Sequence, residues 1–276
     1  MGSFFACGVR SPRPAVRRGG APILRSVRRL PDPSSRPAEG AGARDRFGGA
    51  VPSPAFAFLL ALIMLPSLFW LVTLKRTTDH TVPEEWLMSQ LVPTIHAWTL
   101  QHAPPLDSLL IGISGLGSGW FVALAFAAAG LFALSRGRTD LALLLAAGTL
   151  AFPIEWALKY FTAIPAVSIP ELVRAMFNVH GVGLDDLADF PAGHALRATV
   201  FYGLAAFCIA RLSADRRRGW LAYGLAAALI GAISLIRVYL GAHYPMDVLG
   251  GWMAGGALLS VIVAVHILAA DERSRA

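Results

Sequence analysis

Long apolar segments alternate with short polar connections along most of the chain. Six stretches of about 20 residues carry few charges, and a helix of that length crosses the hydrocarbon core of a bilayer. They lie at residues 54–74, 107–134, 140–158, 193–212, 220–240 and 247–268. In the second stretch, four glycines within 112–119 loosen the start of the helix. The pattern predicts an all-α fold, a polytopic membrane bundle of six transmembrane helices.

The segment at residues 84–102, between the first two spans, has a different pattern. Its apolar side chains recur at helical spacing, at Leu87, Leu91, Ile95 and Trp98. This spacing predicts an amphipathic helix that lies on the membrane surface. A helix packed against the bundle fits the same pattern, and both alternatives stay open.

The charges of the connections orient the bundle. Arginines precede the first span, follow the last, and occupy the connections after spans two and four. Six spans place all four positions on one side, which is predicted to be cytoplasmic because cytoplasmic loops carry excess Lys and Arg. Lys75 and Arg76, at the end of the first span, are the only discordant pair.

The composition agrees with an integral membrane protein. The chain is 55% hydrophobic and 15% charged, with mean hydropathy +0.58, whereas about a quarter of a soluble domain is charged. The net charge of +7 arises within the first 46 residues, where ten arginines face three acidic residues. Residues 1–50 are predicted to be a disordered cytoplasmic arm that touches anionic lipid heads. An organelle transit peptide is the alternative, and nucleic-acid binding is not indicated because aromatic residues are not interleaved with the basic ones.

Ionisable residues collect at the predicted outward ends of the spans. Arg237, His243 and Asp247 lie in the run Ser-Leu-Ile-Arg-Val-Tyr-Leu-Gly-Ala-His-Tyr-Pro-Met-Asp, and Phe-Pro-Ala-Gly-His supplies His194. Titrating groups at a membrane boundary are costly, so they indicate a functional site. The i,i+4 spacing lets Asp247 reach the imidazole of His243 and leave its other ring nitrogen free to attack. Arg237 suits phosphate oxygens and His194 can protonate a leaving alkoxide, so the set indicates covalent phosphoryl transfer.

Two of these runs resemble motifs of a known family. Phe-Pro-Ala-Gly-His-Ala at 190–195 and Arg-Val-Tyr-Leu-Gly-Ala-His-Tyr-Pro-Met-Asp-Val at 237–248 are similar to the second and third motifs of the type 2 phosphatidic acid phosphatase superfamily. That superfamily includes membrane lipid phosphatases, undecaprenyl-diphosphate phosphatases and the soluble vanadium haloperoxidases. The resemblance implies a phosphatase-like core at 105–270, preceded by a segment at 51–104 with the first span and the amphipathic helix.

The resemblance implies a role for each matching residue. His243 would be the nucleophile that takes the phosphoryl group, Asp247 would orient it, and His194 would be the general acid. The phosphate oxygens would be held by Lys159, at the place of the first motif's lysine, by Arg237 and by the amide of Gly193. Members of the family need no metal for hydrolysis, so no metal or other cofactor is expected.

The chain departs from the family pattern at two places. The first motif of the family ends in Arg-Pro where this chain has Ala166 and Val167, and the serine of the second motif is replaced by Ala192. Arg174 and Arg197 are candidates to replace the lost arginine. Losing one preorganised donor typically costs on the order of 10²–10³ in rate, so the departures bear on activity.

The sequence therefore predicts a multi-pass membrane phosphatase that acts on a lipid phosphomonoester or diphosphate through a phosphohistidine. Its site would face outward, in a bacterial plasma membrane, and its partners would be the phosphorylated lipid and the bilayer. One alternative is a catalytically silent member that binds a phosphorylated lipid. Another is a transferase that moves a phospho group between lipids. For Lys159, a purely structural pair with Glu155, four residues earlier, is a further alternative.

Overall fold

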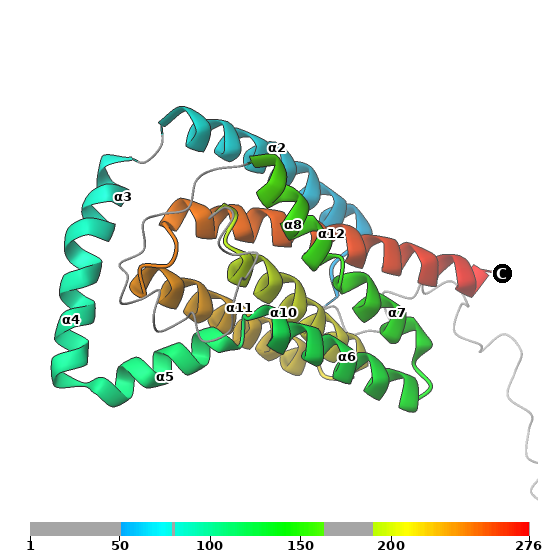
Figure 1. Cartoon of the computed structure of the whole chain (residues 1–276). Coiled ribbons are helices and arrows are strands. Elements are labelled where there is room, and N and C mark those ends of the chain that lie inside the picture. Colours follow the sequence, from blue (N-terminus) through cyan, green and yellow to red (C-terminus); the bar gives the residue numbers. More distant parts are fainter. Residues whose placement is uncertain (1–50, 79–80, 163–189, 276) are drawn as a thin grey trace, which may run out of the picture. The chain divides into compact units, whose positions relative to one another are not determined.

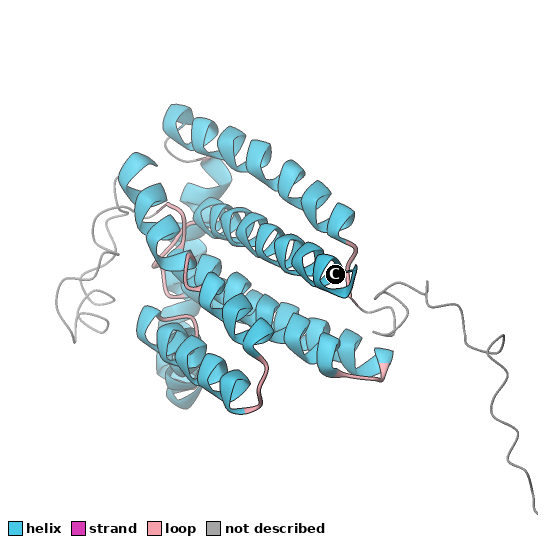
Figure 2. Ribbon diagram, turned by 90° about the vertical axis from the view of Figure 1, so that its right-hand side faces the viewer, coloured by secondary structure: helices cyan, strands magenta, loops and turns pink. Residues whose placement is uncertain are grey.

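The computed structural model of the chain describes residues 51–78, 81–162 and 190–275 (Figure 1). The predicted arm at 1–50 lies outside the described residues, as do Arg174 and the departure at 166–167. Within the described ranges, every regular element is a helix (Figure 2).

Eleven helical elements follow one another along the described chain. They are α2 (Pro54–Thr78), α3 (Val82–Trp86), the π-helical turn η2 (Leu87–Leu91), α4 (Val92–His102), α5 (Pro104–Gly115), α6 (Gly119–Ser135), α7 (Thr139–Gly148), α8 (Ala151–Thr162), α10 (Gly193–Leu212), α11 (Arg216–Tyr239) and α12 (Pro245–Arg275). Five spans are long and apolar enough to cross a membrane, with α7 and α8 forming one of them. Counted as one broken span, the bent pair of α5 and α6 brings the number in the described residues to six, and the predicted all-α membrane bundle is confirmed.

The second span is broken where its glycines lie. The axes of α5 and α6 differ by 53° across the break. Ser118 caps α6 by accepting a hydrogen bond from the amide of Phe121 at 3.3 Å. The break leaves the carbonyl of Gly117 free to accept from Arg197 Nε of α10, at 3.4 Å.

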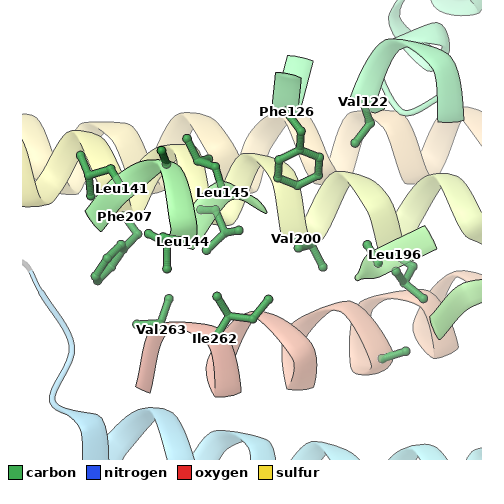
Figure 3. Packing of buried hydrophobic residues seen from close by; sticks show 14 of the residues in the cluster. Val122, Phe126, Leu141, Leu144, Leu145, Leu196, Val200, Phe207, Ile262 and Val263 are labelled. Carbon is green, nitrogen blue, oxygen red and sulfur yellow. The ribbon is translucent and has the colours of Figure 1, made fainter. Parts of the chain in front are cut away.

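The core forms where α10 packs against α11 and α12, and where α12 also runs along α2. Figure 3 shows buried apolar side chains of α10 between those of α7 and α12. The residues labelled there include Leu141, Leu144, Leu145, Leu196, Val200, Phe207, Ile262 and Val263. The N-terminal half of α10 is almost wholly buried, so this helix is held on several sides.

Glycines on α12 permit this close packing. A β-carbon at Gly251 would lie 2.6 Å from the carbonyl oxygen of Ala192, and one at Gly255 would lie 2.8 Å from that of Leu196. Small residues at helix contacts let backbones approach in a membrane, where hydrophobic attraction between helices is weak.

The segment from α3 to α4 is held against the bundle by polar groups. Glu84, His96 and Thr99 are buried, and His96 Nε2 lies 3.1 Å from Asp107 Oδ1 on α5. On the outside, Trp86 and Trp98 are each 58% exposed. Packing against the bundle therefore accounts for the polar face, while these apolar side chains stay exposed.

Gly251→Ala should destabilise the fold, because the new β-carbon would meet backbone and not a flexible side chain. We expect a loss of about 1–3 kcal/mol in the free energy of unfolding, measured by thermal unfolding in detergent micelles. The matched control is Gly224→Ala on α11, where no atom lies within 4 Å of the new carbon. Equal melting temperatures for the two variants would contradict the packing role of Gly251.

Candidate active site

The third motif is shaped by the way α11 ends. Gly241 has φ of 69°, in the left-handed region that glycine adopts without strain. The amide of Ala242 donates to the carbonyl of Arg237 at 3.0 Å, and that of Gly241 donates to the carbonyl of Val238 at 2.9 Å. This pair of bonds is a Schellman closure, and it reverses the chain. Arg237 and His243 consequently lie at the same end of the bundle.

Two carboxylates cap the start of α12. Asp247, in the first turn, accepts a hydrogen bond through Oδ2 from the amide of Tyr244 at 2.9 Å. Glu84 of α3 accepts through Oε1 from the amide of Met246 at 3.0 Å. Helix-start amides lack partners inside the helix, so these bonds satisfy them. Asp247 is thereby folded back toward the turn that carries His243.

The other oxygen of Asp247 binds a residue that the sequence did not assign to the site. Lys75 Nζ, on α2, lies 3.0 Å from Asp247 Oδ1, and the two side chains are 3% and 0% exposed. The ammonium also lies 4.9 Å from the centre of the Tyr244 ring. Lys75 is therefore not a charge in a loop, which explains why it disagreed with the orientation rule.

Arg76, the second discordant cation, also has a specific partner. Its guanidinium donates to the carbonyl of Phe161 at 2.6 Å and to that of Thr162 at 3.1 Å. These carbonyls end α8, where a cation is favoured by the helix dipole. Arg76 thus ties the end of α2 to the end of the helix that carries Lys159.

A second charged cluster joins α8 to α10. Lys159 Nζ lies 3.6 Å from Glu155 Oε1, as the spacing of the two residues predicted. Arg197 Nη1 lies 2.5 Å from Glu155 Oε2. All three residues are buried, so Glu155 bridges two cations from different helices.

Arg197 also contacts the second motif. Its Nη2 lies 3.5 Å from His194 Nδ1, and its Nε donates to the carbonyl of Gly117 at 3.4 Å, in the break between α5 and α6. Gly193 packs so tightly that a β-carbon there would overlap Glu155 Oε1. Of the two candidates to replace the missing arginine, Arg197 therefore lies beside the general-acid candidate.

Hydrogen bonds join the three motifs. The amide of Ala192 donates to the carbonyl of Asp247 at 2.9 Å, linking the second motif to the third. The hydroxyl of Thr162, at the end of α8, donates to the carbonyl of Phe190 at 3.1 Å, linking the first motif to the second. Every predicted site residue that the structure describes is therefore at one end of the bundle, and all are buried. They are Lys159, Gly193, His194, Arg197, Arg237, His243 and Asp247.

A cavity of about 400 Å³ opens beside the second charged cluster. Its lining combines buried charged groups with exposed aromatic side chains on α6 and α8, and consists of Gly119, Trp120, Ala123, Phe152, Glu155, Trp156, Lys159 and Arg197. Trp120 is 85% exposed and Trp156 is 50% exposed. A cavity with cations inside and apolar walls outside suits a ligand with an anionic head and an apolar body.

The fold and the site together define a multi-pass integral membrane protein with phosphatase-like motifs gathered at one end of its helices. Residues 55–269 match the PAP2 superfamily, and the chain belongs to this family. It is 26% identical over 172 residues to phosphatidylglycerophosphatase B of Bacillus subtilis (strain 168). The matched region spans 60% of this chain and 78% of the relative.

A solved structure supports the fold. The crystal structure of a transmembrane PAP2-type phosphatidylglycerolphosphate phosphatase from Bacillus subtilis matches with a TM-score of 0.55 and 23% identity, over 80% of this chain and 96% of that one. The predicted family, the fold class and the enzyme class, a phosphoric ester hydrolase, are confirmed. The roles of individual residues stay predictions.

Arg197→Met should destabilise the protein strongly, because it leaves the buried carboxylate of Glu155 with only the more distant Lys159. Breaking a buried ion pair typically costs about 3–5 kcal/mol, and the double variant Arg197→Met/Glu155→Gln should recover part of it. The measurement is thermal unfolding in micelles.

The control for this prediction is Arg138→Met. The pair of Arg138 with Asp140, at 3.1 Å, has side chains that are 37% and 28% exposed, so its loss should cost about 1 kcal/mol or less. Equal losses for Arg197→Met and Arg138→Met would show that the cluster at Glu155 is not a buried ion-pair network.

Proposed function

We propose that this protein is a lipid phosphatase whose nucleophile is His243 and whose general acid is His194. The family match and the phosphatase relative support the reaction class. One observation carries the choice of residues. The amide of Ala192, two residues before His194, binds the backbone carbonyl of Asp247 at 2.9 Å, so the starts of α10 and α12 are fixed beside each other.

In the first step, a ring nitrogen of His243 attacks the phosphorus. The P–N bond forms as the P–O bond to the lipid breaks, and His194 gives its proton to the departing alkoxide. In the second step, a water oxygen attacks the phosphorus while His194 takes the water's proton. The P–N bond breaks, inorganic phosphate leaves, and both histidines return to their starting states. Asp247 stabilises the positive charge on the imidazole of His243 in both steps.

The phosphate oxygens are held by Lys159, Arg237 and the amide of Gly193, as the family pattern implies. Arg197 takes the place of the arginine missing from the first motif, since its guanidinium lies 3.5 Å from the ring of His194. A phosphate that binds Arg197 competes with the carboxylate of Glu155. The arginine fork can bind two oxygens at once, which favours a phosphate that approaches from the cavity.

The substrate class that fits best is a phosphomonoester on a phospholipid head. The curated relative is named for phosphatidylglycerophosphate, and the cavity between α6 and α8 has apolar walls for a lipid body. The lipid enters from the bilayer past Trp120 and Trp156. The arginines within 136–138 follow α6, and those within 211–218 lie where α10 ends and α11 begins, so both groups are at the end of the bundle opposite the candidate site. Their position supports a site on the outer face of a bacterial plasma membrane.

His243→Asn should lower phosphate release from phosphatidylglycerophosphate in mixed micelles by at least about 10³-fold, because no other group supplies the nucleophile. Substrate with a radiolabelled phosphate should leave a base-stable, acid-labile label on the wild type and none on the variant. The control is His102→Asn, an exposed histidine of α4 that stacks on Trp98.

The same experiment separates the other functions. Equal release by wild type and His243→Asn would reject the proposed nucleophile. Label that moves to a second lipid without free phosphate would identify a transferase. Wild type that binds the lipid but neither releases nor transfers phosphate would identify a silent member.

His194→Ala should slow cleavage of an alkyl phosphate by roughly 10²–10⁴-fold, yet change the first turnover of p-nitrophenyl phosphate little. The nitrophenolate leaves without a proton, whereas an alkoxide needs one. Stopped-flow absorbance measures the burst of nitrophenolate, and the phosphoenzyme should accumulate because the water step still lacks its base. Equal losses on both substrates would argue against a general acid at this position.

A further inference from the structure

We propose that Lys75, on the first membrane-spanning helix, is a positioning residue that fixes Asp247 and through it His243. This inference rests on the proposed function of the third motif. Lys75 belongs to none of the three motifs, and its contact with Asp247 joins residues 172 positions apart in the chain.

The contact between Lys75 and Asp247 is short and buried. Lys75 Nζ meets Asp247 Oδ1 at 3.0 Å, while Oδ2 of the same carboxylate is held by the amide of Tyr244 at 2.9 Å. With one partner on each oxygen, the carboxylate plane has a defined orientation. The ring of Tyr244, the residue next to His243, lies 4.9 Å from the ammonium. Lys75 therefore contacts the carboxylate that caps this turn and the ring of the residue next to His243.

The charge of Asp247 requires such a partner. A carboxylate that is 0% exposed is stable as an anion only where a cation or several donors meet it. In the proposed mechanism, Asp247 must be an anion to stabilise the imidazolium of His243. Lys75 supplies a positive charge that favours this anion. The carboxylate of Glu84, bound to the amide of Met246 in the same first turn, adds negative charge there and makes a cation more necessary.

The use of lysine in this chain agrees with a specific role. The sequence has 22 arginines and only two lysines, Lys75 and Lys159. Both are buried at the candidate site, at 3% and 4% exposure. An ammonium is a compact point charge, whereas a guanidinium is a wide planar fork. The position between Asp247 and the ring of Tyr244 is occupied by the compact cation, Lys75.

Lys75→Met keeps the unbranched shape and most of the length of the side chain, and it removes the charge. We expect kcat for phosphatidylglycerophosphate in mixed micelles to fall on the order of tenfold to a hundredfold, the range typical of residues that orient a reacting group from behind. KM should change by less than about threefold, because Lys75 is not among the proposed phosphate ligands. Lys75→Arg should recover part of kcat, since it restores the charge.

The decisive comparison uses Asp247→Asn. In that background Lys75→Met should cause no further loss of kcat, because the carboxylate through which Lys75 acts is gone. The double variant also leaves no unpaired carboxylate at position 247, so it should fold even where Lys75→Met alone does not. If the losses of kcat in the two single variants multiply in the double variant, the proposal is overturned. A raised KM with unchanged kcat in Lys75→Met would also overturn it, because Lys75 would then be a phosphate ligand.

Two controls complete the test. Thr77→Ala changes an exposed residue of α2 whose hydroxyl bonds only within its own helix, and its kcat should stay within about twofold of wild type. His243→Asn distinguishes a failure of the proposed function from a failure of the role proposed for Lys75. If it keeps full activity, the proposed function is wrong. If it is inactive while Lys75→Met is normal, only the role of Lys75 is wrong.

Discussion

The burial of charge among apolar helices is the constraint on which the rest of this structure depends. Glu155 and Asp247 are 5% and 0% exposed, and each is met by a cation from another helix, Arg197 or Lys75. Burying an ionised carboxylate without a partner in such surroundings would destabilise the fold by several kcal/mol. Pairing therefore decides which helix ends meet: α8 with α10, and α2 with α12. The same contacts gather the motifs at one end of the bundle.

Close backbone approach is the second requirement, and it links stability to the site. Gly251 and Gly255 let α12 approach the carbonyls of Ala192 and Leu196 on α10. The hydrogen bond from Ala192 to the carbonyl of Asp247 needs this spacing. Helix packing therefore sets the distance between the second and third motifs. A change that separates α10 from α12 would loosen the site as well as the core.

Local properties of the sequence were enough to predict the spans and the motif residues. Hydropathy located the five spans and the segment of the bent pair, and the glycines expected to loosen the start of the second helix lie where α5 and α6 are broken apart. The partners of the buried charges were harder to predict. The pairing of Lys75 with Asp247 depends on how α2 runs along α12, and hydropathy does not encode that contact. Sequence spacing likewise joined Glu155 to Lys159, but not to Arg197 on another helix.

In the proposed mechanism, an arginine at another position takes the place of the one absent from the first motif. A phosphate responds to where a positive charge lies, and not to which helix carries it. Arg197 lies one turn after His194 on α10, and it donates to the carbonyl of Gly117 in the break between α5 and α6. Its guanidinium is shared with Glu155, so in the proposed mechanism phosphate must displace a carboxylate. A phosphate dianion carries more charge than that carboxylate. Lys159, which also contacts Glu155, would bind the same phosphate as Arg197. Both effects favour the exchange.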